Sequence, residues 1–205
     1  MIKAILFDFD GVLTLHETGS QSVCDYICSV TGTEKELFRR AYKKHNSDLL
    51  TGKVKHEDVW ADICAAAGRD MDVDILYKSF INTPINPGML RLVRDIKQSK
   101  YKVGMITDNK SDRIRSIIDY HNWKALFDAI LVSAEVGVCK DKPQIFQKVF
   151  QTLEAAPEEC VFIDNTQKNL TVPDRMGVAT VFFDFAKNDV PGLRDTLSLL
   201  GVEGL

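Results

Sequence analysis

Short, unbroken apolar runs recur along the chain, separated by longer stretches in which apolar residues return at helical spacing. An unbroken run predicts a strand buried on both faces, because a half-exposed strand would alternate apolar and polar positions. Strands separated by helices predict an α/β fold with a doubly wound parallel sheet, in which helices cover both faces. The predicted strands cover residues 2–7, 102–106, 129–132, 160–163 and 179–183, and the predicted helices about 88–99, 111–121, 143–154, 167–176 and 191–200.

The connection after the first strand is far longer than a single crossover needs. It reads as several helices: a capping-box pattern at 33–36 predicts a helix running to about 46, and two more are predicted at 56–67 and 72–81. An Asn-Pro-Gly turn at 86–88 then marks the return. We therefore expect a catalytic α/β core made of residues 1–14 and 86–205. Residues 15–85 are expected to form an inserted α-helical cap domain over the carboxyl ends of the strands, where open α/β sheets bind their ligands.

The composition narrows the range of partners. The chain has 205 residues, 45% of them hydrophobic and 27% charged, which indicates a folded protein with a sizeable core. A net charge of −3 argues against a nucleic-acid surface, and no apolar run is long enough for a membrane helix. The five cysteines are scattered without the spacing of a zinc site. We expect a cytoplasmic protein, a monomer or weak dimer, with no nucleic-acid or membrane partner.

Polar residues interrupt the chain where four of the predicted strands end. The carboxyl ends of parallel strands share one edge of the sheet, so these side chains should converge on one crevice. Each of them alone would more often be a loop, cap or surface residue than a catalytic one, and the argument rests on their joint order. They are Asp8 and Asp10 after the first strand, Thr107 and Asp108 after the second, Lys140 after the third, and Asp164 and Asn165 after the fourth.

Acidic groups, a hydroxyl and a lysine in one crevice suit phosphoryl transfer. A phosphate dianion repels a carboxylate nucleophile, so charge must be neutralised before attack. A divalent cation on oxygen ligands and a lysine can do this, while a threonine hydroxyl donates to a non-bridging oxygen. Catalysis then rests on positioning and electrostatic stabilisation.

Four segments in this order resemble the motifs of the haloacid dehalogenase (HAD) superfamily, and the resemblance covers nearly the whole chain. The helical insertion resembles the cap that capped, phosphatase-like members carry after the first strand of a Rossmann-like core. The segments are DFDGVL at 8–13, Thr107, Lys140 with PQIF at 143–146, and FIDN at 162–165 with Asn169 and Gly177.

The resemblance implies a magnesium-dependent phosphatase acting on a small phosphorylated metabolite. It implies that Asp8 attacks phosphorus to form an aspartyl-phosphate, and that Asp10 is the general acid and then the general base. Thr107, the backbone at Asp108 and Lys140 would bind the phosphate. Mg²⁺ would lie on Asp8, Asp10 and an oxygen of the pair Asp164 and Asn165.

Several points stay open at this stage. Many relatives carry two acids where this chain has Asp164 and Asn165, so either residue could be the metal ligand. Lys142 is an alternative to Lys140, although Lys140 keeps the following segment in register. A carboxylate at Asp108 would be unfavourable beside phosphate unless it turns away or helps to anchor the cap.

The reaction also has alternatives. A phosphomutase would use the same intermediate, and a non-catalytic binding or regulatory protein would explain a metal site weakened by Asn165. Dehalogenation is disfavoured because it leaves Asp10 without a task. In the insertion, His16 is a candidate for touching substrate, whereas Trp60 and Phe80 are expected in the core of the cap.

Overall fold

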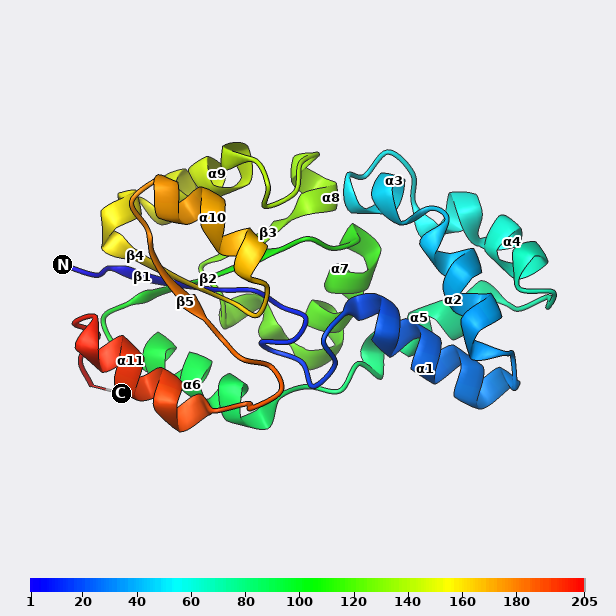
Figure 1. The fold of residues 1–205 in the computed structure, drawn as a ribbon, viewed down its shortest axis with the longest axis horizontal. Coiled ribbons are helices and arrows are strands. Elements are labelled where there is room, and N and C mark those ends of the chain that lie inside the picture. Colours follow the sequence, from blue (N-terminus) through cyan, green and yellow to red (C-terminus); the bar gives the residue numbers. More distant parts are fainter. Residues whose placement is uncertain (205) are drawn as a thin grey trace.

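The computed structural model describes residues 1–204 and contains a five-stranded parallel sheet with helices on both faces (Figure 1). The strands run in the order β3-β2-β1-β4-β5, which places β1 at the centre of the sheet. Every neighbouring pair is parallel. The predicted doubly wound α/β fold is therefore confirmed. The strands are β1 (Ala4–Phe7), β2 (Lys102–Thr107), β3 (Ala129–Val132), β4 (Cys160–Asp164) and β5 (Ala179–Phe182).

Successive residues of β1, β3 and β4 face opposite hydrophobic clusters. In β1, Ile5 and Phe7 belong to one cluster, and Ala4 and Leu6 to the other. Figure 1 shows α6 and α11 on one face of the sheet and α9 and α10 on the opposite face. Burial on both faces explains why the inner strands have no alternating polar positions. The helices of this part are α6 (Pro87–Gln98), α7 (Ser111–His121), α8 (Ser133–Val136), α9 (Pro143–Leu153), α10 (Gln167–Arg175) and α11 (Val190–Leu199), with 3₁₀ turns η1 (Trp123–Ala125) and η2 (Pro157–Glu159).

The fifth strand corrects one prediction. We expected residues 179–183 to be buried on both faces, but β5 is only partly buried and Phe182 is 49% exposed. β5 is the edge of the sheet and pairs with β4 alone. An unbroken apolar run therefore identified the strand without revealing its position in the sheet.

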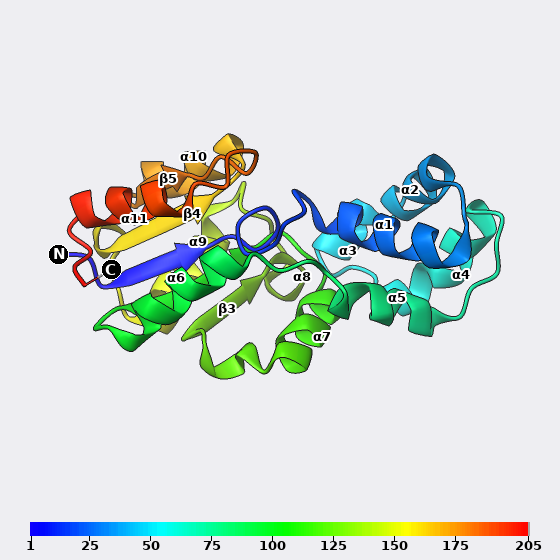
Figure 2. The ribbon, with the colours of Figure 1, turned by 90° about the horizontal axis from the view of Figure 1, so that it is seen from below.

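Five helices between β1 and α6 lie beyond the carboxyl ends of the strands (Figure 2). The chain leaves and re-enters the sheet region through adjacent backbones, because Thr14 and Ile85 form an antiparallel bridge. Two hydrogen bonds extend this pairing, from Leu15 N to Pro84 O (2.8 Å) and from Asn86 N to Leu13 O (2.9 Å). The five helices are α1 (Gly19–Thr31), α2 (Lys35–Lys43), α3 (Asn46–Leu50), α4 (His56–Ala66) and α5 (Val73–Ile81).

The helix predicted from 33 to 46 is wrong in its extent and its cap. The chain forms α2, turns at Lys44 and His45, and continues as α3. The capping residue is Glu34, whose carboxylate accepts hydrogen bonds from the backbone N–H groups of Glu36 and Leu37 (2.8 and 2.6 Å). The hydroxyl of Thr33 is bonded to that of Thr31 instead.

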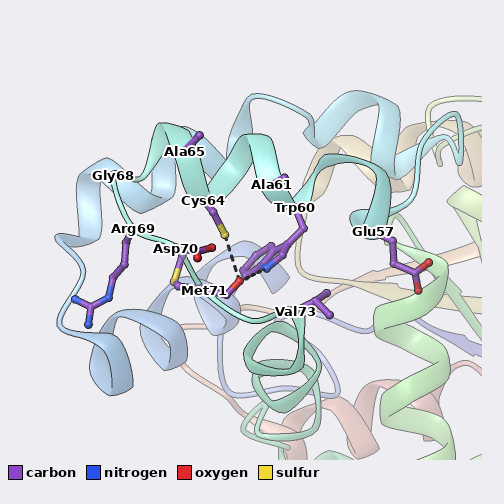
Figure 3. A pocket seen from close by; sticks show the side chains of 10 residues that line it. All are labelled: Glu57, Trp60, Ala61, Cys64, Ala65, Gly68, Arg69, Asp70, Met71 and Val73. Atoms are coloured by element: carbon purple, nitrogen blue, oxygen red, sulfur yellow. Dashed lines mark hydrogen bonds between the residues drawn. The ribbon is translucent and has the colours of Figure 1, made fainter.

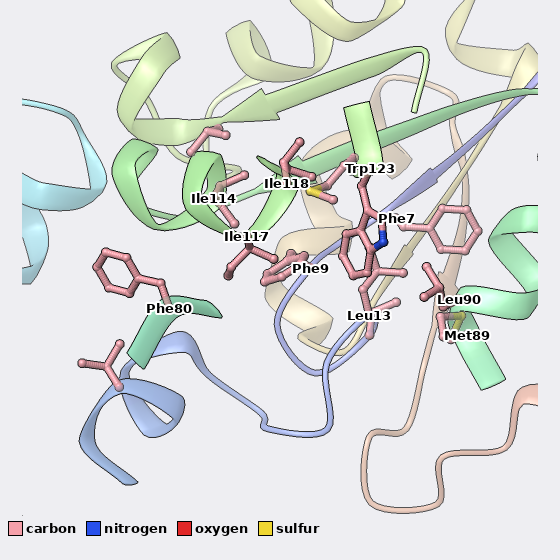
Figure 4. Packing of buried hydrophobic residues seen from close by; sticks show 14 of the residues in the cluster. Phe7, Phe9, Leu13, Phe80, Met89, Leu90, Ile114, Ile117, Ile118 and Trp123 are labelled. Carbon is pink, nitrogen blue, oxygen red and sulfur yellow. The ribbon is translucent and has the colours of Figure 1, made fainter. Parts of the chain in front are cut away.

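One hydrophobic cluster runs from the sheet into the helical insertion. Phe80 of α5 belongs to the same cluster as Phe9 and as Ile114 and Ile117 of α7, and Figure 4 shows these side chains on adjoining segments. Trp60 and Phe80 are buried, as predicted. Within residues 1–204, none of the helices is both long enough and apolar enough to cross a membrane.

Candidate active site

The loop after β1 is held against the loop after β4. Asp8 N–H donates to Ile163 O (2.9 Å), which continues the pairing of the two strands. Gly11 has φ +78°, and a Cβ there would lie 2.2 Å from Asn165 Nδ2. Glycine is therefore required at this position, both by the left-handed backbone and by the closeness of Asn165.

Lys140 forms ion pairs with two carboxylates near the loop after β1. Its Nζ lies 2.8 Å from Asp8 Oδ1 and 2.6 Å from Asp164 Oδ2. Burial alone would lower the pKa of Lys140, but the Asp8 and Asp164 carboxylates outweigh it and raise that pKa. Burial raises the pKa of Asp8, against the pull of Lys140. A further cation beside Asp8 would therefore favour its ionised, nucleophilic form.

The loop that carries Lys140 explains the acid at position 108. Asp108 Oδ1 accepts the backbone N–H of Lys140 (2.8 Å), so this carboxylate helps to fix the loop. Burial raises the pKa of Asp108. Lys140 is 1% exposed, whereas the Lys142 side chain is 57% exposed and pairs with its neighbour Asp141. Of the two lysines considered, Lys140 is the one that reaches Asp8.

Thr107 and Asn109 line the same cavity as Asp8 and Asp10. Thr107 is 1% exposed at the end of β2. Asn109 Nδ2 donates to Thr107 Oγ1 (3.2 Å) and to Asp10 Oδ2 (2.7 Å). The amide thus links the threonine hydroxyl to the second aspartate of the DFDGVL motif.

Asp10 has a partner that the sequence did not reveal. The guanidinium of Arg113, which is 0% exposed, binds both carboxylate oxygens: Nη1 lies 2.8 Å from Oδ2 and Nη2 lies 2.8 Å from Oδ1. Arg113 also donates to Thr83 Oγ1 (3.3 Å), where the chain leaves the insertion. The only sequence signal was a cation in the first turn of an amphipathic helix, which is usually a surface residue.

The two residues after β4 differ in what their side chains contact. Asp164 is 0% exposed and accepts hydrogen bonds from Lys140 Nζ, the Thr166 N–H (2.7 Å) and Asn169 Nδ2 (3.1 and 3.2 Å). Asn165 instead lines the pocket beside Asp8 and Asp10. No group of three or more His, Cys, Asp or Glu side chains suited to a metal occurs within residues 1–204. A cation here would rely on Asp8, the carbonyl of Asp10 and the amide oxygen of Asn165.

These side chains surround a cavity of about 330 Å³ between the sheet and the insertion. The insertion supplies Glu17 to Ser20 from the segment entering α1, and Lys43, Asn46 and Leu50 from the region of α2 and α3. His16, a candidate for touching substrate, is not among the lining residues; its Nδ1 is 3.1 Å from Ser22 Oγ. All seven residues predicted for the site except Asp164 line the cavity, and Asp164 lies behind Lys140.

A larger hollow of about 520 Å³ lies within the insertion, between α4 and the segment that follows it (Figure 3). Trp60 Nε1 donates to Met71 O (2.8 Å), and Cys64 Sγ contacts the same carbonyl (3.7 Å). The polar groups at its floor are thus already bonded to one another. None of the residues predicted for the site lines this hollow.

Several named proteins are similar to this chain in sequence. The chain is 24% identical to bifunctional epoxide hydrolase 2 of Sus scrofa, an alignment that covers 98% of this chain and 39% of the relative. It is 30% identical to the Rattus norvegicus protein of the same name, with 97% and 38% covered. The chain thus spans about two fifths of these relatives. Phosphoglycolate phosphatase of Aquifex aeolicus is 24% identical, with 87% of this chain and 83% of that protein covered.

Solved structures share the fold. A HAD family enzyme from Bacteroides thetaiotaomicron, solved with magnesium and inorganic phosphate, superposes with a TM-score of 0.70 at 19% identity, covering 89% of this chain and 94% of that one. L-2-haloacid dehalogenase from Xanthobacter autotrophicus gives 0.67 at 14% identity, with 97% and 88% covered. The haloacid dehalogenase-like hydrolase family model matches residues 2–171, which include β1 to β4 and every residue of the predicted site. The chain belongs to the haloacid dehalogenase-like hydrolase family.

Proposed function

We propose that this chain is a magnesium-dependent phosphatase that hydrolyses a small phosphorylated metabolite through an aspartyl-phosphate on Asp8. The contact of Lys140 Nζ with Asp8 Oδ1 (2.8 Å) carries the proposal, because it places a buried cation beside a carboxylate at the floor of a small cavity. A phosphate bound there would have the nucleophile and a neutralising charge side by side. The phosphoglycolate phosphatase relative supports this class of reaction.

Each residue of the site has a distinct role in the proposed reaction. Asp8 attacks phosphorus, and the bond from phosphorus to the leaving oxygen breaks as Asp10 protonates that oxygen. Asp10 then removes a proton from water, which attacks phosphorus and breaks the bond to Asp8. Thr107 and the backbone at Asp108 hold the non-bridging oxygens, and Lys140 offsets their negative charge. Asp164 keeps Lys140 in place.

The donor set fits magnesium. Asp8, the carbonyl of Asp10 and the amide of Asn165 offer only oxygen ligands at the cavity, which a hard cation prefers. Burial raises the pKa of Asp8, so additional positive charge beside this carboxylate would stabilise its ionised form. When bound, Mg²⁺ would supply this charge and polarise the phosphate.

We further propose that residues 15–85 act as a cap domain over a core of residues 1–14 and 86–205. The cavity draws its lining from both parts, so a bound metabolite would be screened from bulk water. A cavity of about 330 Å³ also favours small substrates over phosphoproteins.

The test is phosphate release from a panel of small phosphomonoesters, with Mg²⁺ or with a chelator. We expect turnover that needs the metal and falls by at least about a thousandfold in Asp8→Asn, because the amide is no nucleophile. Lys142→Met is the control, since Lys142 is exposed and pairs with Asp141. Phosphate release that survives Asp8→Asn would overturn the mechanism.

A further inference from the structure

We infer that the cavity contains a second anion subsite, formed by Lys110 with Lys43 and Asn46, which binds a carboxylate on the molecule whose phosphate reaches Asp8. The inference rests on the proposed function and names the substrate class: phosphomonoesters that also carry a carboxylate. Lys140 is already paired with Asp8 and Asp164. Lys110, Lys43 and Asn46 are therefore a separate source of positive charge and hydrogen-bond donors.

Lys110 is a buried cation, and residues 1–204 hold no anionic partner for it. It is 5% exposed and lines the cavity, yet its Nζ makes no hydrogen bond or ion pair to any side chain within residues 1–204. Its Nζ lies over the ring of Tyr42, 5.7 Å from the ring centroid. Burial and the charge of Arg113 lower the pKa of Lys110 to about 8, although Asp10 and Asp112 act in the opposite direction. An ammonium held in this way gains most from an anion that arrives with a ligand.

The insertion adds two more polar groups to the same cavity. Lys43, the last residue of α2, lines it and makes no ion pair in the described part of the chain. Asn46 Oδ1 is buried without a hydrogen-bond partner among residues 1–204. The oxygen and nitrogen of an amide can exchange places by rotation, so Asn46 can turn a donor toward an anion.

The balance of charge favours a carboxylate over a second phosphate. Of the two free ammonium groups at the subsite, only Lys110 is buried, and Glu17 lies on the same cavity. One buried charge and an amide match a monoanion, whereas a phosphate dianion usually requires guanidinium groups or more lysines. Lys110 also borders a neighbouring cavity of about 270 Å³, so the experiment must show that the carboxylate and the phosphate belong to one molecule.

Two matched pairs of compounds test the inference. Turnover compares 2-phosphoglycolate with ethyl phosphate, which has a methyl group in place of the carboxylate. Binding compares phosphonoacetate with ethylphosphonate by calorimetry, which needs no chemistry. We expect the carboxylate compound to be favoured about tenfold or more in each pair. We expect Lys110→Met to reduce each ratio by about tenfold and Lys43→Met to reduce it less. Lys44→Met is the control, because Lys44 is exposed and pairs with Asp62.

The outcomes separate this inference from the proposed function. Turnover that depends on Asp8 but does not distinguish the two substrates, with ratios unchanged in Lys110→Met, would overturn the subsite and leave the phosphatase intact. Absence of turnover, with a phosphonoacetate preference that Lys110→Met removes, would support the subsite and overturn the proposed reaction. A stronger preference for ethylene glycol bisphosphate than for 2-phosphoglycolate would overturn the choice of a carboxylate. Acetate binding as tightly as phosphonoacetate would place the anion in the neighbouring cavity instead.

Discussion

Two buried cations each hold one of the aspartates of the DFDGVL motif. Lys140 contacts Asp8 with one ammonium, which leaves the rest of that carboxylate available to phosphorus or a metal. Arg113 instead takes both oxygens of Asp10, and Asn109 adds a third donor. Asp10 is thus held by Asn109, which lines the cavity, and by Arg113, which does not, so its orientation depends on a helix far from it in sequence.

Arg113 should matter to stability because its loss leaves Asp10 without its countercharge. We expect Arg113→Met to lower the free energy of unfolding by about 3 kcal/mol, the scale for breaking a buried ion pair. Urea denaturation of Asp10→Asn/Arg113→Met should show part of this stability restored. The control is Arg115→Met, whose side chain is 71% exposed and pairs with Glu135, with an expected loss below about 1 kcal/mol. Equal losses in the two arginine variants would contradict the assignment.

Asn165 should limit the affinity for magnesium. It offers a neutral oxygen at the cavity, whereas the carboxylate of Asp164 is occupied by three donors. We expect Asn165→Asp to tighten Mg²⁺ binding by roughly tenfold in a calorimetric titration, because an added charge strengthens a hard-cation site. Asp164→Asn is the comparison and should act mainly by loosening Lys140. An unchanged affinity in Asn165→Asp would move the ligand role to Asp164.

At the scale of elements, the start of α1 packs directly on the pair formed by Arg113 and Asp10. A Cβ at Gly19, the first residue of α1, would lie 2.4 Å from Arg113 Nη1 and 2.8 Å from Asp10 Oδ2. The absence of a side chain therefore lets the insertion approach the proposed acid/base residue closely. Any movement of α1 would change the surroundings of Asp10.

Gly19→Ala should therefore destabilise the protein, although alanine is the better helix former. We expect the free energy of unfolding to fall by about 1–3 kcal/mol, since overcrowding at a packed contact outweighs a propensity gain of about 1 kcal/mol. Turnover of the best substrate should fall as well. Gln21→Ala is the control for changes in the first turn, because Gln21 is exposed and does not line the cavity. A Gly19→Ala protein more stable than the wild type would contradict the packing described for this contact.

The sequence predicted the elements whose signal is local, and it missed contacts made between distant segments. Apolar runs marked the strands, and the polar residues after them marked the cavity. No bounds were predicted for α1, because Gly19 and Ser20 at its start are typical of a loop. The partnership of Arg113 with Asp10 spans 103 positions, and no local pattern encodes it. Lys110 likewise reads as a solvent-exposed residue before a helix until the fold buries it.

At the scale of the whole molecule, one hydrophobic cluster joins the sheet to the insertion through α5 and α7. His56 of α4 strengthens the contact, since its Nδ1 lies 2.7 Å from Asp112 Oδ2 at the start of α7 and its Nε2 lies 2.8 Å from Tyr42 OH. Ser133 Oγ also donates to Leu50 O (2.7 Å). The two parts therefore meet through α7 and α8, on the side of the cavity where Lys110 lies.

The bridge between Thr14 and Ile85 has a consequence for how such a protein can change over evolution. The two ends of residues 15–85 lie side by side, so the segment is inserted into the catalytic core at a single position. A shorter or differently shaped insertion could replace it at this position without displacing β1 or the DFDGVL loop. Recognition of new substrates could then evolve in one stretch of sequence while the phosphate chemistry is inherited unchanged in another.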